Sequence, residues 1–116
     1  MSYVRNSSIE DAQFNTLLLE VIDRSLADSL GEEVRNVVYL YLKAVLFLKK
    51  EDIPKELVAF HAGLIKLFGS SATLVEDVIV KELFSKIGVK FSAKDTFVNL
   101  VEKARTYFVL SKKKKE

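Results

Sequence analysis

The side chains that could do acid–base or metal chemistry are few and scattered along this 116-residue sequence. There is one histidine, His61, and there is no cysteine, so thiolate and disulfide chemistry are both excluded. A zinc site would need carboxylate ligands, because His61 supplies only one of the roughly four donors that zinc requires. His61 shares a helical face with Leu57, Leu64 and Phe68, and a lone histidine on an apolar stripe is typical of a core-boundary residue.

The carboxylates occur in pairs, but these pairs lie near the starts of predicted helices. They are Glu32-Glu33, Glu51-Asp52 and Glu76-Asp77. The positive end of a helix dipole explains acidic residues there better than catalysis does. Glu76 falls on the apolar side of its helix, and Thr73 three residues earlier indicates a capping box. The glycines are too scattered to form a phosphate loop, and no nucleophile-elbow motif surrounds a serine. We therefore predict a non-enzymatic protein with no catalytic residue, metal ligand or cofactor.

Length and composition fit one globular domain. Apolar residues make up 49% and charged residues 29% of the chain, which is too apolar for a disordered protein. The first residues, MSYVRNSSIEDAQ, lack a basic start followed by an apolar run, so they do not resemble a signal peptide. Together with the absence of cysteine, this favours a cytoplasmic location.

Apolar side chains recur at helical spacing in five segments, and glycine, proline and capping residues mark the ends of these segments. The expected helices cover 9–30, 32–49, about 54–68, about 72–87 and about 94–110. Ser8 with Asp11 and Ser92 with Asp95 form capping-box patterns before the first and last helices. We predict an all-α, single-domain bundle of about five helices over 9–110. A loose leader, 1–8, precedes it and a disordered basic tail, 111–116, follows it.

The segment 37–48, VVYLYLKAVLFL, is apolar except for Lys43. It is too short to span a membrane, which takes about 20 apolar residues, and we expect no membrane contact. Helical spacing predicts a core-facing side formed by Val34, Val37, Val38, Tyr41, Val45 and Leu48. The opposite side carries Tyr39, Leu40, Leu46 and Phe47. Either this helix is the central one and is buried on all sides, or the opposite side is a protein interface, and the interface we expect is that of a homodimer.

The order of several short motifs is familiar. A long first helix is followed by a Leu-Gly-Glu break at 30–32, by Ile53-Pro54 before the third helix, and by Phe68-Gly69 before a fourth helix containing Lys-x-Leu. Across 14–91 this order resembles the archaeal nitrosopumilus output domain family. The resemblance implies a small helical archaeal module of unknown biochemical role. In relatives, this module is sometimes attached to signalling domains. The resemblance does not identify any functional residues in this sequence.

The C-terminal part of the chain is basic, with ten basic and six acidic residues in 70–116. Its lysine run is Lys112, Lys113, Lys114 and Lys115, which could attract nucleic acid. The third and fourth helices also have the layout of a helix-turn-helix. However, Ile65 is bulky where close packing needs a small residue, and Glu76 and Asp77 lie where phosphates require positive charge.

These observations predict a protein-interaction or oligomerisation module that binds itself or another protein through Tyr39, Leu40, Leu46 and Phe47. The alternative is a nucleic-acid-associated protein that binds through Lys112 to Lys115, and this remains open.

Overall fold

The computed structural model describes residues 8–91 and 94–114, and no strand occurs within these ranges. Within them, five α-helices and two 3-10 helices follow one another. They are α1 (Ile9–Leu30), α2 (Glu32–Leu46), η1 (Lys50–Lys55), α3 (Leu57–Phe68), η2 (Gly69–Ser71), α4 (Ala72–Ile87) and α5 (Phe97–Lys114). The predicted all-α bundle is confirmed. The predicted leader falls on residues 1–7, which lie outside the described residues, and on Ser8.

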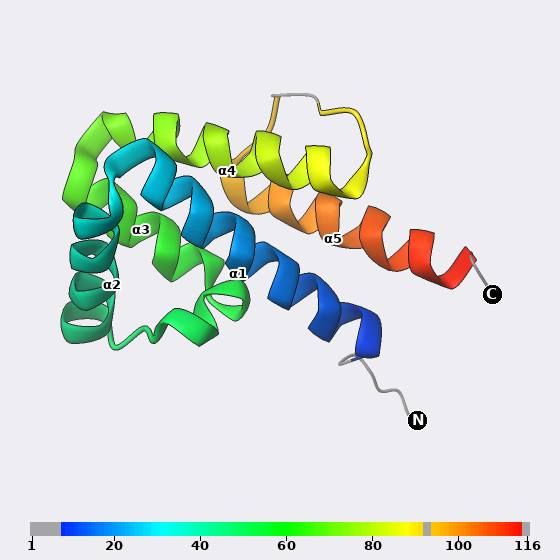
Figure 1. Ribbon diagram of the computed structural model, residues 1–116, viewed down its shortest axis with the longest axis horizontal. Helices are drawn as coiled ribbons and strands as arrows, with labels where there is room; N and C mark the ends of the chain where they lie inside the picture. The colour runs from blue at the N-terminus through cyan, green and yellow to red at the C-terminus, as the bar shows by residue number, and fades with distance from the viewer. Residues whose placement is uncertain (1–7, 92–93, 115–116) are drawn as a thin grey trace.

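The central helix is α1, which packs against α2, α4, α5 and η1 (Figure 1). Its apolar stripe is fully or almost fully buried and consists of Phe14, Leu18, Val21, Ile22 and Leu26. The predicted cap is present, because Ser8 Oγ accepts a hydrogen bond of 3.0 Å from the backbone N–H of Asp11. The suggestion that 32–49 forms the central helix is wrong, since α2 stands at one end of the molecule with one face open (Figure 1).

Helix α2 ends at Leu46 and does not reach Lys49 as predicted. The chain reverses at Phe47, which has a left-handed backbone with φ of 56°. The backbone N–H groups of Phe47 and Leu48 both bond to the carbonyl oxygen of Leu42, and this satisfies the end of the helix. The reversal returns Leu48 to the core.

Pro54 does not begin the third helix, contrary to the prediction. Ile53 and Pro54 are buried inside η1, and the backbone of Glu56 leaves helical geometry with φ of −132° and ψ of 51°. The N–H of Glu56 bonds to the carbonyl of Ile53 over 2.9 Å, which closes a 3-10 turn. Consequently α3 starts only at Leu57 and is one turn shorter than expected.

Helices α2 and α3 approach closely at Gly63, a buried residue of α3. A side chain there would meet Leu42 Cδ2 from α2, and Leu46 Cδ1 would lie 3.2 Å from its Cβ. The glycine thus lets two leucines of α2 lie directly on the α3 backbone.

The stretch Leu57–Ile87 is long enough to cross a membrane and contains an 18-residue window with a mean hydropathy of 1.4, as a membrane-spanning helix would. In the structure it forms two helices that pack against each other, α3 and α4, separated by η2. Gly69 makes this break possible because its φ of +59° is accessible to glycine. The apolar residues of both helices contribute to the core. The expected absence of membrane contact stays a prediction.

Helix α5 starts three residues later than predicted and continues further. Thr96 Oγ1 accepts a hydrogen bond of 3.1 Å from the N–H of Asn99, as an N-cap does. The predicted cap, Ser92, lies outside the described residues. The helix extends through Lys114, so the prediction of disorder is wrong for 111–114.

Candidate protein-interaction surface

Phe47 is the least expected residue of the structure, since its side chain is 88% exposed. A left-handed backbone costs a residue with a Cβ atom on the order of 1 kcal/mol, and glycine or asparagine usually occupies such a position. Phe47 therefore combines an unfavourable backbone conformation with an unfavourable exposure to water. Neither contributes to the stability of the isolated chain, which points to a contact outside it.

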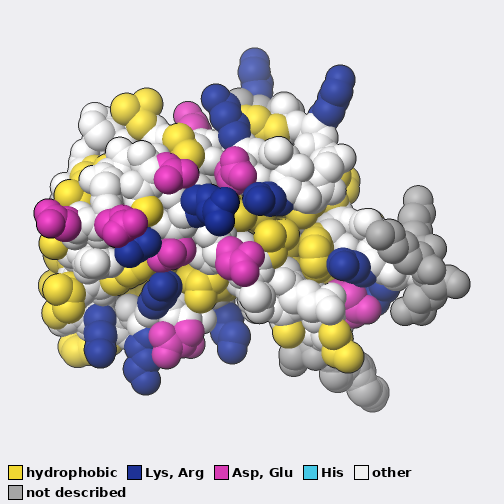
Figure 2. Space-filling view, viewed as in Figure 1, with side chains coloured by type: hydrophobic (Ala, Val, Ile, Leu, Met, Phe, Trp, Pro, Cys, Tyr) yellow, Lys and Arg dark blue, Asp and Glu magenta, His cyan; other side chains and the backbone are white. Residues whose placement is uncertain are grey.

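Exposed apolar side chains concentrate around Phe47. Twelve large hydrophobic residues are exposed among the described residues, and five of them lie on or directly after α2. We call these five the α2 surface: Val34, Val37, Leu40, Val45 and Phe47. Hydrophobic side chains accordingly gather over α2 at the left edge of the molecule (Figure 2). A concentration of exposed apolar side chains of this kind is typical of an interaction site.

A polar cluster holds α2 against α1 and so positions the α2 surface. The hydroxyl of Tyr39 donates to Asp23 Oδ1 over 2.8 Å, and Lys50 Nζ lies 3.2 Å from the same oxygen. Arg35 Nη1 lies 3.3 Å from Asp23 Oδ2. Lys50 Nζ also sits 4.9 Å from the centre of the Tyr39 ring, in a cation–π contact. One carboxylate of α1 thus engages three side chains from α2 and η1.

Asp23 stays ionised and Tyr39 stays protonated over the neutral pH range. Partial burial raises the pKa of Asp23, but hydrogen bonds from Tyr39 and Lys50 and the nearby positive charges outweigh burial and lower it. Burial, followed by the bond to Asp23, raises the pKa of Tyr39, which therefore remains a donor. Because the pKa of Asp23 is lowered on folding, its contribution to stability is present above the ordinary value of 3.8 and is lost as the pH falls through the lowered pKa.

The structure divides the four residues predicted to form an interface. Leu40 and Phe47 are exposed, whereas Tyr39 and Leu46 are partly buried against the core and belong to the contacts that hold α2 in place. The predicted core-facing side is wrong in part, since Val34, Val37 and Val45 are exposed. The buried face is instead centred on Val38 and Leu42. It is rotated around the helix axis from the predicted core-facing side by about 100°, which corresponds to one residue.

His61 and Glu76 form a second polar contact, between α3 and α4. Glu76 is almost fully buried, and one of its oxygens lies 2.5 Å from His61 Nδ1. The His61 ring is 41% exposed and stacks on Phe97 of α5. Glu76 is therefore not part of a capping box, because Thr73 Oγ1 donates instead to the carbonyl of Ser70. Sequence reasoning placed Glu76 on the apolar side correctly but could not pair it with His61.

The buried Glu76 carboxyl should make stability depend on pH. Burial raises the pKa of Glu76 above its ordinary 4.5, although the hydrogen bond and charge of His61 oppose this. A raised pKa means that the folded state binds more protons, so stability falls as the pH rises from 4.5 through the raised value.

We expect urea unfolding between pH 4 and 8 to show this decline in the natural protein but not in Glu76→Gln. The control variant Asp77→Asn, which changes the exposed neighbouring carboxyl, should keep most of the decline in stability with pH. Parallel curves for the natural protein and Glu76→Gln would contradict this assignment.

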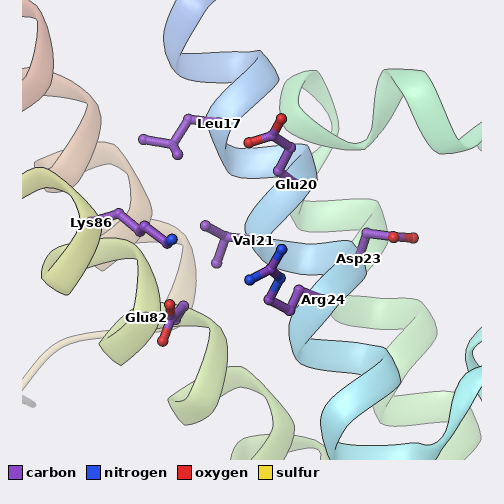
Figure 3. A pocket seen from close by; sticks show the side chains of 7 residues that line it. All are labelled: Leu17, Glu20, Val21, Asp23, Arg24, Glu82 and Lys86. Atoms are coloured by element: carbon purple, nitrogen blue, oxygen red, sulfur yellow. The ribbon is translucent and has the colours of Figure 1, made fainter.

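A groove between α1 and α4 has a volume of about 270 Å³. Arg24 and Lys86 extend into it over Val21, while Asp23 points away from it (Figure 3). Glu20 and Glu82 also line it, so the charges are mixed. Within residues 8–91 and 94–114, three or more His, Asp or Glu side chains do not gather in an arrangement that could hold a metal ion.

The lysine run lies at the end of α5. Lys112 Nζ is 5.3 Å from the centre of the Phe108 ring, and Lys113 is exposed. Lys114 is the last residue of the helix, and Lys115 lies outside the described residues. The alternative of nucleic-acid binding through Lys112, Lys113, Lys114 and Lys115 stays a prediction.

No family model, curated protein or solved structure matches this chain. The resemblance of residues 14–91 to the nitrosopumilus output domain family therefore stays a prediction. Any functional conclusion depends on the geometry of the molecule itself.

Proposed function

We propose that this chain is a protein-interaction module that acts by burying the α2 surface against another polypeptide. The observation that carries the proposal is Phe47, which is 88% exposed in a left-handed backbone conformation. Burying one such aromatic side chain at an interface is worth roughly 1.5–3 kcal/mol. That gain exceeds the backbone cost of about 1 kcal/mol, so the residue becomes favourable only when a partner covers it.

The rigidity of the surface also supports the proposal. Tyr39, Arg35 and Lys50 hold α2 through Asp23, and Leu42 and Leu46 pack against Gly63. A surface that is already held in its binding geometry loses little conformational entropy on association. The apolar residues of α2 that face solvent are thus presented by a helix with a well-packed opposite face.

Site-specific photo-crosslinking in cells that produce the full chain tests this proposal. Benzoylphenylalanine replaces Leu40 in one variant and Leu74 in the other, because these leucines are 66% and 67% exposed. Leu74 lies on α4, which does not pack against α2 within the described residues. We expect discrete adducts from position 40 that Phe47→Asn removes, and none from position 74. Equal patterns from both positions would overturn the proposal.

A further inference from the structure

We propose that the polypeptide covering the α2 surface is a second copy of this chain, packed with its α2 antiparallel about a two-fold axis near Leu40. This inference rests on the proposed function and identifies the partner of the same surface. The support comes from the charges at the two ends of α2 and from the spacing of its exposed side chains.

The two ends of α2 carry opposite charges. Glu32 and Glu33 occupy the first turn, and Lys43 lies in the last turn with Lys49 just beyond it. All four side chains are exposed, and none makes an ion pair within residues 8–91 and 94–114. An antiparallel copy places the acidic end of one helix beside the basic end of the other, and the helix dipoles also favour this. A parallel copy would bring like charges together.

A hollow beside Leu40 receives the acidic end in this arrangement. Its volume is about 410 Å³, and its charged lining residues are Lys43, Lys49, Lys50 and Glu51. Its α2 lining runs from Asn36 to Lys43, and Lys43 lies in the last turn of α2, beside which the N-terminal half of an antiparallel copy must lie. Lys50 is already paired with Asp23, whereas Lys43 and Lys49 make no ion pair within the described residues. These two ammonium groups favour a carboxylate-bearing partner, and Glu32 and Glu33 meet that need.

Several exposed residues of the α2 surface are spaced symmetrically, as a two-fold contact requires, although Val45 falls opposite Asn36. Val34 and Phe47 are equally far along the chain from the midpoint between Leu40 and Tyr41, and so are Val37 and Ala44. A two-fold axis at this midpoint therefore sets Val34 against the second copy's Phe47. Ala44, a small exposed residue, leaves room opposite Val37 for the helices to approach.

The size of the surface predicts a reversible dimer. Apolar patches of this kind measure on the order of 500 Å². A standard interface buries roughly 800 Å² on each partner, so the charged flanks must also take part. We expect a dissociation constant of about micromolar order.

Disulfide crosslinking decides the orientation, because the natural chain contains no cysteine and each introduced thiol is unique. Two cysteines bridge only when their Cα atoms are within about 7 Å. Under mild oxidation we expect Leu40→Cys to crosslink with itself and a mixture of Val37→Cys with Ala44→Cys, two exposed positions inside α2, to give a mixed dimer. Glu33→Cys alone should stay uncrosslinked, because the two copies of residue 33 lie roughly 20 Å apart along the helices.

The outcomes separate this inference from the proposed function. Self-crosslinking of Glu33→Cys would show a parallel contact and overturn the antiparallel arrangement. A natural chain that remains monomeric by light scattering at every concentration, with no crosslinks, would overturn the second copy as partner. Neither result affects the photo-crosslinking difference between positions 40 and 74, on which the proposed function depends. Loss of that difference would overturn both.

Discussion

Replacing Phe47 by asparagine should stabilise the isolated chain and weaken its self-association in the same variant. Asparagine adopts the left-handed conformation of residue 47 at lower cost, so the free energy of unfolding should rise by roughly 0.5–1 kcal/mol. The aromatic side chain at the interface is lost, and a buried aromatic contact contributes about 2 kcal/mol to binding. The dissociation constant should therefore rise about 30-fold. Urea unfolding at low protein concentration measures the first effect, and light scattering over a dilution series measures the second.

A matched pair of variants controls for general loss of apolar surface. Leu40→Gln and Leu74→Gln remove side chains of equal type and nearly equal exposure, 66% and 67%. Only Leu40 lies on the α2 surface, so only Leu40→Gln should weaken the dimer, again by more than tenfold. Equal weakening by the two variants would indicate non-specific association. A Phe47→Asn variant that loses stability would show that the aromatic ring supports the fold of the single chain.

Replacing Gly63 by valine should produce the largest loss of stability. The new side chain would meet Leu42 and Leu46 where α2 rests on α3. Leu42 is fully buried and has no free space to move into, so the helices must separate or the core must repack. Overpacking of this kind costs about 2 kcal/mol, which corresponds to a fall of about 10 °C in the melting temperature. Thermal unfolding followed by circular dichroism measures this change.

The neighbouring residue provides the control for Gly63→Val. Ala62→Val adds a β-branched side chain to the same helix at an exposed position. It should change stability by no more than about 0.5 kcal/mol, because surface substitutions away from special features have small effects. Equal destabilisation by both variants would mean that β-branching in α3, and not the contact with α2, is responsible.

The helical architecture could be predicted from the sequence because each sequence signal involves residues that are close together along the chain. The apolar stripe of α1 repeats at helical spacing, Ser8 caps its first turn, and Gly31, Gly69 and Gly88 mark ends where the chain needs a positive φ. The helix ends that were predicted wrongly depend on tertiary contacts or on backbone conformations for which the local sequence signal is weaker. Pro54 looked like a helix start but is buried in a 3-10 turn, and Phe47 stops α2 without a glycine.

The candidate surface was only half predictable for the same reason. Residues 37–48 are apolar on every side, so periodicity could not decide which side faces the core. Leu40 and Phe47 were placed correctly on the open side. Tyr39 and Leu46 were not, because their positions depend on Asp23 of α1 and Gly63 of α3.

The sequence by itself determined the helical class, the approximate helices and the presence of more apolar surface than one core face of α2 could use. These follow from spacing and composition, which are properties of neighbouring residues. The tertiary structure decided the rotation of α2, the pairing of His61 with Glu76 and the exposure of Phe47. Each of these depends on residues at least 15 positions apart or on where the chain folds back, and the spacing of residues along a single helix cannot report such contacts.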